Sequence, residues 1–419
     1  MPVALREGLA ACRDSGEARQ RRLIRIQGFH PRFRKQVELL ARRSAAIEDL
    51  AESFPGLLFA LATDYATAAA RDHAIRLVES GASLREAAAA LGLPRWLKRL
   101  PAVAYREPLS DIPDSRGFVQ RATALMPDGA TESRVWLWGL LYGARYCGEE
   151  YALWAAGWLA RNAPIFSLPY GEDTFRYLTA WAWASTHRES ALARLIGRPW
   201  TSGIGLRRAL DDLSTWRLRI DLDVCLTERR GNRWLPAGSA LGFEFVPLDS
   251  AEAFIEEARA LDNCLDIYAA KLRLNRSSIY SIRRGGQRIG VVEIGPHPED
   301  AARPALLQLR TRRNRRADPE LWQAAYTWLG ATRAGRRAPR LEPPPSWSRE
   351  VARHIWREYL DWQAERGKDS RMQALVLGET TAGSSAAAGR RGAGIGRRPG
   401  PSPPRAPASL TVASGKRSS

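Results

Sequence analysis

Three short runs of aliphatic, β-branched and aromatic residues between Leu261 and Trp322 constrain the fold more than any other part of this chain. Gly285-Gly286 separates the first run from the second, and a loop with prolines separates the second from the third. Such runs bounded by turn residues predict strands, and the Gly-Gly pair predicts a tight hairpin. Helical patterns flank them. The sequence therefore predicts an α+β fold, with a mainly α-helical N-terminal region, a small antiparallel-sheet module flanked by helices and a disordered C-terminal tail.

Alternation within the predicted strands assigns each side chain to one face of the sheet, because successive side chains point to opposite faces. The apolar face, expected to pack against a helix, collects Tyr280, Ile282, Val292, Ile294, Leu307 and Leu309. The opposite face collects Ser281, Arg283, Glu293, Gln308 and Arg310. This second set predicts a charged, hydrogen-bonding site on a rigid sheet, or else the solvated face that most antiparallel sheets keep.

The same segment resembles the PcfJ-like family, which is named for a protein encoded on conjugative plasmids. The resemblance is clearest over residues 250–330, and nine polar positions carry it: Asn263, Cys264, Tyr268, Ser281, Arg283, Glu293, Gln308, Arg310 and Asn314. The chain departs from the family pattern where Leu265 replaces a small residue and Thr311 replaces a glycine, which argues against a close backbone approach to a ligand there. The resemblance implies an association with mobile elements and their mobilisation proteins, and it implies no reaction.

Arginines are concentrated directly after the third predicted strand. The cluster consists of Arg310, Arg312, Arg313, Arg315 and Arg316. The formal charge of the chain is +19, and residues 378–419 contribute seven basic residues against one acid. Guanidinium groups suit phosphate because each presents a planar fork of donors. The cluster predicts phosphate contacts to DNA or RNA, with a merely solvated surface in an arginine-rich protein as the alternative.

Changes in composition and periodicity divide the chain into five expected parts. These are a basic N-terminal arm (1–31), an α-helical region (32–215), the PcfJ-like α+β module (216–335), a C-terminal helix (336–377) and a disordered basic tail (378–419). The alternation of Leu218, Ile220, Leu222 and Val224 predicts a strand that leads into the module. Asp249 and Glu252 have the spacing of a helix cap, so a helix is expected from there to Leu261.

Two patterns in the helical region admit a functional and a structural interpretation. Tryptophans at helical spacing, such as Trp154 and Trp158, would form either a base-stacking platform or, more commonly, a core. Residues 83–99 resemble a helix-turn-helix whose second helix would offer Arg95, Lys98 and Arg99 to DNA. Alanine-rich helices joined at a Gly-Leu-Pro turn are also common in any helical array, with Trp96 and Leu97 buried.

Metal, cofactor and membrane signatures are not found in the sequence. The four cysteines, at positions 12, 147, 225 and 264, form no CxxC pair and no cluster with histidine, so neither a metal site, a cofactor nor a disulfide framework is expected. No apolar run of about 18 residues and no signal peptide appears. A cytoplasmic protein that does not bind membranes is expected.

Cys264 and Glu293 are the residues on which a catalytic function would depend. Cys264 would act as a nucleophile if a base activated its thiol, with Glu293 or Tyr268 close by in the fold, but a buried, inert cysteine is the favoured interpretation. Glu293 would equally form a cross-strand ion pair with Arg283 or Arg310. The sequence favours an accessory protein of mobile or conjugative elements that contacts nucleic acid without catalysis. The alternative is a nucleotide- or nucleic-acid-directed enzyme that uses the polar face around Cys264 and Glu293.

Overall fold

The computed structural model describes residues 26–378, apart from 110–111, 167–168, 229–232, 274–276 and 334–348, together with Gln20 and Ile24. Most of the expected basic arm and all of the expected tail beyond Gly378 lie outside the described residues. The described residues belong to one compact unit, which combines a helical region with one five-stranded antiparallel sheet. The predicted α+β class is therefore confirmed.

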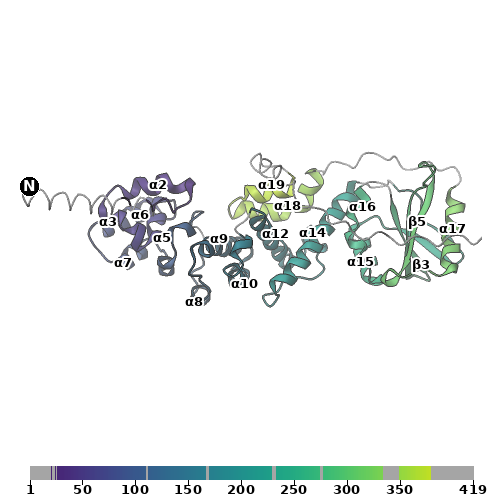
Figure 1. Ribbon diagram of the computed structural model, residues 1–419, viewed down its shortest axis with the longest axis horizontal. Coiled ribbons are helices and arrows are strands. Elements are labelled where there is room, and N and C mark those ends of the chain that lie inside the picture. The colour runs from purple at the N-terminus through teal and green to yellow at the C-terminus, as the bar shows by residue number, and fades with distance from the viewer. Residues whose placement is uncertain are drawn as a thin grey trace, which may run out of the picture. The chain divides into compact units, whose positions relative to one another are not determined.

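Helices build the region that precedes the sheet (Figure 1). They are α2 (Pro31–Ala41), α3 (Ala45–Glu48), α4 (Leu50–Ser53), α5 (Pro55–Ala62), α6 (Ala68–Glu79), α7 (Leu84–Ala90), α8 (Arg116–Ala124), α9 (Ala130–Cys147), α10 (Glu149–Leu159), α11 (Ala163–Phe166), α12 (Pro169–Thr186), α13 (Ala191–Arg194) and α14 (Leu206–Glu228), with the 3₁₀ turns η1 (Arg95–Arg99) and η2 (Ala102–Ala104). Side-chain caps set several starts, because Thr67, Ser115 and Ser190 each accept a hydrogen bond from a backbone N–H three residues later.

Tryptophans fill the cores of the helical region. One core is formed by residues of the elements from α2 through α10. A second core is formed by residues of α9, α10, α12 and α14 together with residues later in the chain, such as Phe254 and Trp356. Trp136, Trp181 and Trp216 are at most 1% exposed, and Trp158 packs edge-on against the half-buried Trp154. These rings are either buried or packed against the core, so the core interpretation is confirmed.

The strand predicted around Leu218 and Val224 is wrong, because these residues belong to the helix α14. Its buried positions include Ala209, Leu213, Trp216, Ile220 and Val224. They recur every three or four residues, which is the period of a helix. Leu218 is 37% exposed, whereas Leu222 is buried on another side of the helix, so the apparent alternation comes from a helix with two packed sides. The module boundary expected at residue 216 consequently falls inside this helix.

The helix-turn-helix predicted at residues 83–99 does not form. Its first helix, α7, has the predicted capping box between Ser83 and Glu86. The second element is only the five-residue 3₁₀ turn η1, and it buries Trp96 and Leu97. A helix that reads a major groove must present several turns free of the protein core. The alternative of a helical array with a buried Trp96 is confirmed.

One antiparallel sheet forms the centre of the C-terminal module, with the strands in chain order. Its strands are β1 (Gly238–Ala240), β2 (Phe243–Pro247), β3 (Ser278–Arg284), β4 (Gln287–Pro296) and β5 (Pro304–Thr311). The last three are the predicted strands, and Gly285 and Gly286 join β3 to β4 with positive φ at both positions, as a two-residue hairpin of this twist requires. The short strands β1 and β2 were not predicted.

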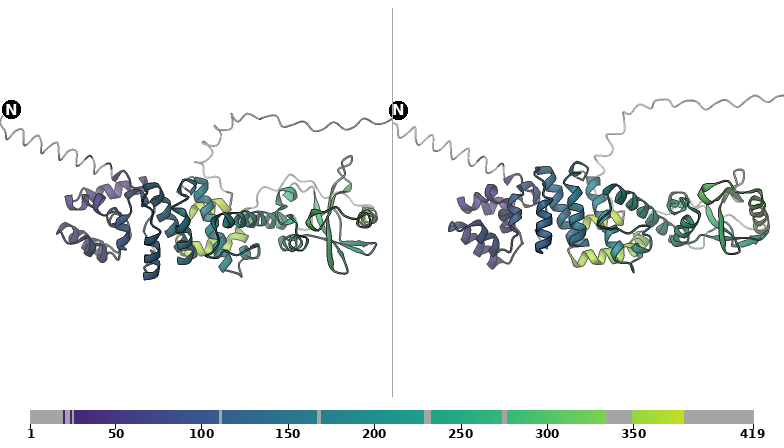
Figure 2. Two further views of the ribbon diagram at one scale, coloured as in Figure 1. Left: turned by 60° about the horizontal axis from the view of Figure 1, so that its bottom comes forward. Right: turned by 90° about the horizontal axis from the view of Figure 1, so that it is seen from below.

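The two faces of the sheet are covered by different helices (Figures 1 and 2). Helix α17 (Pro319–Arg333) covers one face, where Trp328 stacks on Phe245 and contacts the ring of Tyr280. Helices α15 (Ala251–Leu261) and α16 (Ala269–Arg273) lie on the other side, joined by the 3₁₀ turn η3 (Leu265–Ile267). Packing of the apolar face against a helix is confirmed, with one exception in β5.

Leu307 is the exception, because it is 46% exposed while Leu309 is 2% exposed. The register of β4 and β5 shifts at this point: Glu293 pairs with Gln308 and Ile294 pairs with Leu306, so Leu307 has no partner. A bulge of this kind inserts one extra residue and breaks the alternation of faces. The prediction that Leu307 belongs to the core is wrong, and Leu306 takes its place against that core.

Helix α15 begins one residue later than predicted. Its cap is Ser250, whose hydroxyl accepts a hydrogen bond from the backbone N–H of Ala253. Asp249, the expected cap, instead accepts a hydrogen bond from Arg233 at 2.8 Å. A serine is as good a cap as an aspartate, and the aspartate here has a cationic partner.

Two C-terminal helices pack against the helical region. They are α18 (Arg349–Glu365) and α19 (Ser370–Val376), which contact α12 and neighbouring helices. Asp369 accepts hydrogen bonds from Arg176 at 3.0 Å and from the hydroxyl of Tyr142 at 2.8 Å.

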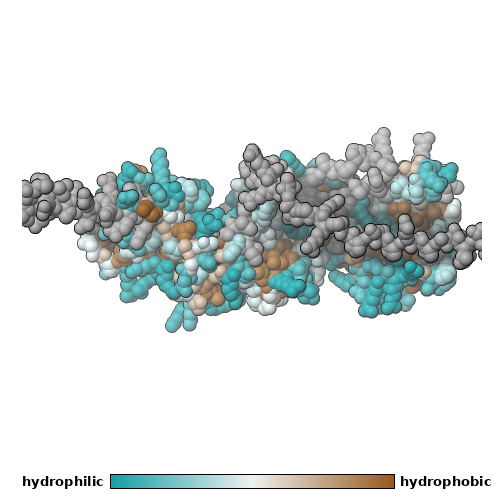
Figure 3. Space-filling view, in the orientation of Figure 1, coloured by the Kyte–Doolittle hydropathy of each residue, from teal (hydrophilic) through white to brown (hydrophobic). Residues whose placement is uncertain are grey.

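The visible surface of the molecule is largely hydrophilic, with apolar side chains in smaller patches (Figure 3). Among the described helices, none combines the length and the apolar content that crossing a membrane requires.

Candidate functional site

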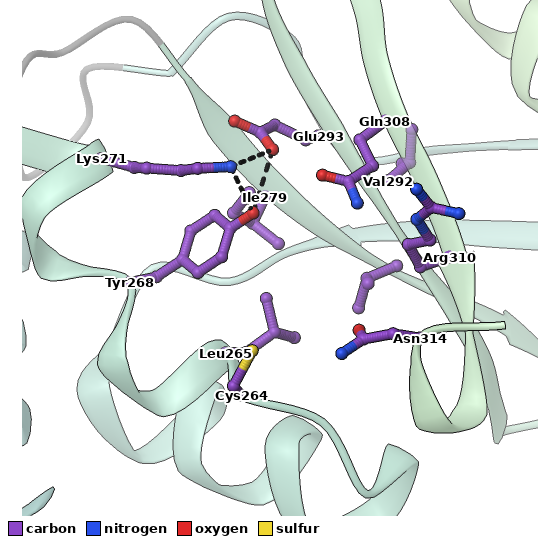
Figure 4. Close-up of a pocket in the computed structure, with 11 residues that line it drawn as sticks. Cys264, Leu265, Tyr268, Lys271, Ile279, Val292, Glu293, Gln308, Arg310 and Asn314 are labelled. Carbon is purple, nitrogen blue, oxygen red and sulfur yellow. Dashed lines mark hydrogen bonds and ion pairs between the residues drawn. The ribbon is translucent and has the colours of Figure 1, made fainter. Parts of the chain in front are cut away.

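A pocket of about 410 Å³ lies between the polar face of the sheet and the η3–α16 segment. Its lining includes Cys264, Leu265, Tyr268, Lys271, Ile279, Val291, Glu293, Gln308, Arg310 and Asn314. Tyr268 and Lys271 extend from one side toward Glu293, while Gln308, Arg310 and Asn314 lie on the other (Figure 4). Pockets of about 300–1,000 Å³ with a few convergent polar groups are typical of small-molecule sites.

The antiparallel register of the strands brings the sheet residues of the pocket together. Ile279 pairs with Glu293, which pairs in turn with Gln308 on β5. Val291 pairs with Arg310 in the next row of the same face. Side chains of directly paired residues lie close together on one face, so three strands supply a compact, rigid wall. The register therefore brings some of the nine polar residues predicted from the sequence together in the pocket.

Tyr268, Lys271 and Glu293 form a hydrogen-bonded group at one end of the pocket (Figure 4). The ammonium group of Lys271 donates to the hydroxyl of Tyr268 at 2.8 Å and lies 3.4 Å from the Oε2 atom of Glu293. The Tyr268 hydroxyl donates to the same oxygen at 3.1 Å. Burial raises the pKa of Tyr268, so its hydroxyl is protonated at neutral pH and acts as a donor. Glu293 therefore pairs with Lys271, and its predicted ion pair with Arg283 or Arg310 is wrong.

Lys271 was not among the predicted site residues, although the sequence contains a signal for it. It follows Tyr268 by three residues, and side chains at this spacing lie on the same side of a helical turn. The hydrogen bond to Tyr268 raises the pKa of Lys271 above its usual range, which keeps the ammonium charged. The charge of Glu293 is therefore compensated within the pocket.

Six of the nine predicted polar residues line this pocket. They are Cys264, Tyr268, Glu293, Gln308, Arg310 and Asn314. The other three do not: the side-chain oxygen of Asn263 accepts a hydrogen bond from the backbone of Leu265, and the Nε group of Arg283 donates to the hydroxyl of Ser281 at 3.2 Å. Ser281 is completely buried. These three residues support the fold around the pocket.

Helix α15 covers the part of the polar face that holds Ser281. It places Glu257, which is completely buried, 2.9 Å from the Nε atom of Arg288 on β4. Burial raises the pKa of Glu257, opposed by the Ser281 hydroxyl and by the Arg288 charge. Helix α15 thus covers this part of the polar face, beside the pocket. Neither Glu257 nor Arg288 was predicted, because no local pattern shows that α15 lies over this face.

Cys264 is exposed, which corrects the interpretation of a buried and inert cysteine. It follows the end of α15, where Asp262 has a positive φ and turns the chain away from the helix. That turn places the thiol at the edge of the pocket (Figure 4). No described histidine or carboxylate forms a hydrogen bond with it, so the geometry supplies no base for a nucleophilic cysteine.

A strained turn presents the arginine cluster. The 3₁₀ turn η4 (Arg312–Asn314) follows β5, and both Arg313 and Asn314 have positive φ. Arg312, Arg313, Arg315 and Arg316 are exposed, whereas Arg310 is half buried in the pocket. Arg313 forms an ion pair with Asp262 at 2.8 Å. Arg312, Arg315 and Arg316 have no ion-pair partner within the described part of the chain.

No group of three or more histidine, cysteine, aspartate or glutamate residues with the arrangement of a metal site occurs among the residues that the structure describes.

Comparison of the chain with protein-family models, with curated proteins and with solved structures finds no match in any of the three. The resemblance to the PcfJ-like family therefore stays a prediction that rests on the residues of the sequence.

Proposed function

We propose that this protein contacts DNA or RNA through the phosphates, without catalysis, as a PcfJ-like accessory protein of mobile or conjugative elements. The observation that carries the proposal is the set of three exposed arginines, Arg312, Arg315 and Arg316, which cluster at one turn and form no ion pair with a described residue. We call these three residues the arginine edge. A polyanion supplies the counter-charge that the described part of the protein does not provide there.

The pairing of other arginines in the module supports this proposal. Arg284 pairs with Glu320, and Arg288 pairs with both Glu256 and Glu257. Among the described residues, these two arginines have acidic partners on the surface of the module, whereas the three arginines of the edge have none. Contacts to phosphates would fix the position of nucleic acid without selecting a base sequence.

The test is a titration of fluorescent DNA and RNA with the full chain at several salt concentrations. An Arg312/Arg315/Arg316→Ala variant is expected to weaken binding and to reduce the log–log salt slope by about one unit for each phosphate that the variant no longer binds. A matched control is the Arg349/Arg353/Arg357→Ala variant, which removes the same charge from exposed positions on α18. Equal effects in both variants would show that total charge decides binding, and the proposal for the edge would then be dropped.

The alternative function, a nucleotide- or nucleic-acid-directed enzyme, rests on the pocket. A binding protein is expected to keep its affinity for nucleic acid in the Cys264→Ala and Glu293→Gln variants. An enzyme would lose turnover in one of them. The association with mobilisation proteins rests on the family resemblance, and mobilisation genes beside the gene for this chain would support it.

A further inference from the structure

Four side chains that line the pocket have no hydrogen-bond or ion-pair partner among the described residues. They are Cys264, Gln308, Arg310 and Asn314. Gln308 and Arg310 are half buried, whereas Cys264 and Asn314 are exposed. A half-buried polar group usually finds a partner, because an unsatisfied buried donor or acceptor costs about 1–3 kcal/mol. Three of these residues, Gln308, Arg310 and Asn314, lie together on the same side of the pocket (Figure 4). Among the described residues, this side of the pocket therefore offers three polar side chains to a ligand.

Charge indicates what kind of ligand the pocket accepts. Lys271 and Glu293 compensate one another at one end, with 3.4 Å between their charged atoms. Arg310 has no acidic partner in the described residues, so the pocket carries one uncompensated positive charge. A guanidinium group binds phosphate with two parallel hydrogen bonds. An anionic group, and a phosphate in particular, is the complement of Arg310.

The remaining lining is suited to a nucleobase. Gln308 and Asn314 each carry both a donor and an acceptor, the combination that pairs with the edge of a base. Leu265, Ile279 and Val291 supply an apolar surface beside the ring of Tyr268, against which a planar base can pack. The volume of about 410 Å³ accommodates one such unit with its phosphate.

The backbone at Asn314 supports a role in binding. Its φ of 56° lies in the left-handed region, and the preceding Arg313 has a φ of 58°. Two successive residues of this kind cost of order 1–2 kcal/mol each, although asparagine tolerates the conformation better than arginine. Strained backbone of this kind clusters at ligand sites. Here it directs the Asn314 amide into the pocket (Figure 4).

We infer that this pocket binds a single nucleotide, with its phosphate on Arg310 and its base between the amides of Gln308 and Asn314. The nucleotide comes either free from solution or as an unpaired nucleotide of a strand. The second source rests on the proposed function, because the arginine edge lies beside Arg310 and Asn314 in the chain and would hold the neighbouring phosphates.

Calorimetric titration of the full chain with AMP, CMP, GMP and UMP tests the inference. We expect saturable binding of at least one of them, and at least tenfold weaker binding in the Gln308→Ala and Asn314→Gly variants. Glycine is used at position 314 because it adopts a positive φ without strain. The control is Gln323→Ala, an exposed position on α17. Equal affinity for ribose 5-phosphate or inorganic phosphate would overturn recognition of the base.

Single-stranded hexanucleotides in competition with the bound mononucleotide distinguish the two sources. A strand that competes at lower concentration than the mononucleotide identifies an unpaired nucleotide of a strand, and failure to compete identifies a free nucleotide. If the wild-type chain binds none of the four nucleotides but shows salt-dependent binding of DNA, the pocket inference fails and the proposed function stands. Nucleotide binding without any binding of nucleic acid would support the pocket and overturn the arginine edge.

The thiol of Cys264 allows nucleotide binding to be measured in the wild-type chain, with no residue replaced. Because this exposed thiol lines the pocket, a bound nucleotide is expected to slow its alkylation by iodoacetamide several-fold. Mass spectrometry of the peptide that contains Cys264 measures the rate, and Cys225, which is buried, serves as the internal reference. Unchanged alkylation at a saturating nucleotide concentration would place the nucleotide elsewhere and overturn the inference.

Discussion

The carboxylate of Asp262 lies 2.8 Å from the guanidinium of Arg313, and both residues have left-handed backbone conformations. Asp262 ends α15, and Arg313 belongs to the turn after β5. The ion pair therefore joins the two segments that carry Cys264 and Asn314 on either side of the pocket. It also neutralises one member of the predicted arginine cluster.

This pairing predicts unequal contributions from the arginines. Replacement of Arg313 with Ala is expected to change the salt slope for DNA binding less than replacement of Arg315, because the charge of Arg313 is already compensated. Asp262→Asn is expected to steepen the slope by up to about one unit, since it frees the Arg313 guanidinium for a phosphate. Titrations at several salt concentrations measure both effects. A shallower slope in Asp262→Asn would contradict the prediction.

The bulge in β5 predicts opposite outcomes for two neighbouring leucines. Leu309→Asp buries an uncompensated charge beneath α17 and is expected to cost on the order of 3–5 kcal/mol of unfolding free energy. Leu307→Asp, at the exposed bulge, is expected to change that free energy by about 0.5 kcal/mol or less. Urea unfolding measures both. Similar losses of stability in the two variants would show that Leu307 faces the core after all.

His30 predicts a dependence of stability on pH. Burial, and then the charges of Arg106, Arg32 and Arg34, lower the pKa of His30 below 6.5 in the folded chain. Its neutral ring accepts a hydrogen bond from the backbone of Arg32 at the start of α2. The stabilisation is thus fully present above pH 6.5 and is lost as the pH falls through the lowered folded pKa.

The matched variant for this effect is His30→Asn, because asparagine caps a helix well and does not titrate. Between about pH 7 and pH 5, the free energy of unfolding is expected to fall less in this variant than in the wild type. Chemical denaturation at each pH, with the remaining histidines unchanged, gives the difference. Parallel curves for the two proteins would rule out His30 as the source.

Asp369 is expected to hold α19 in place. Its carboxylate pairs with the buried Arg176 and also accepts hydrogen bonds from two backbone N–H groups that begin α19. Asp369→Ala is expected to cost about 1–3 kcal/mol, because it removes the cap of α19 and the nearest carboxylate of the buried Arg176, which keeps Glu172 and Asp173 within 3.8 Å. The control is Glu365→Ala, whose side chain is 72% exposed. A thermal melt in which both variants match the wild type would refute the role of Asp369.

The sequence predicts those features that arise from local periodicity. The three central strands and the Gly285-Gly286 hairpin follow from alternation and turn chemistry. The same reasoning fails at α14, where a helix buries two sides and so imitates a strand between Leu218 and Val224. It fails again at Leu307, because the sequence of a strand does not show where a bulge inserts one extra residue and changes which side chains face the core.

The candidate site shows the same limit. Gln308 and Arg310 reach the pocket because they share a strand face, which alternation reveals. Lys271 reaches the pocket from α16, and Glu257 covers the neighbouring part of the polar face from α15. Both placements depend on how the helices lie over the sheet. Ser281 was assigned to the correct face, but the helix above it decides that it is buried and not available to a ligand.

Helix α14 has a consequence for how the chain behaves as a whole. Arg219, near its middle, lies 2.9 Å from Asp266 in the η3 turn, beside Leu265 of the pocket. The same helix contributes Trp216 to the core that contains the ring of Trp356 on α18. Melting of the helical region and loss of the pocket are therefore expected to occur in one cooperative transition. A ligand in the pocket would then raise the melting temperature reported by tryptophans remote from it, since binding only to the folded state stabilises every part that unfolds with it.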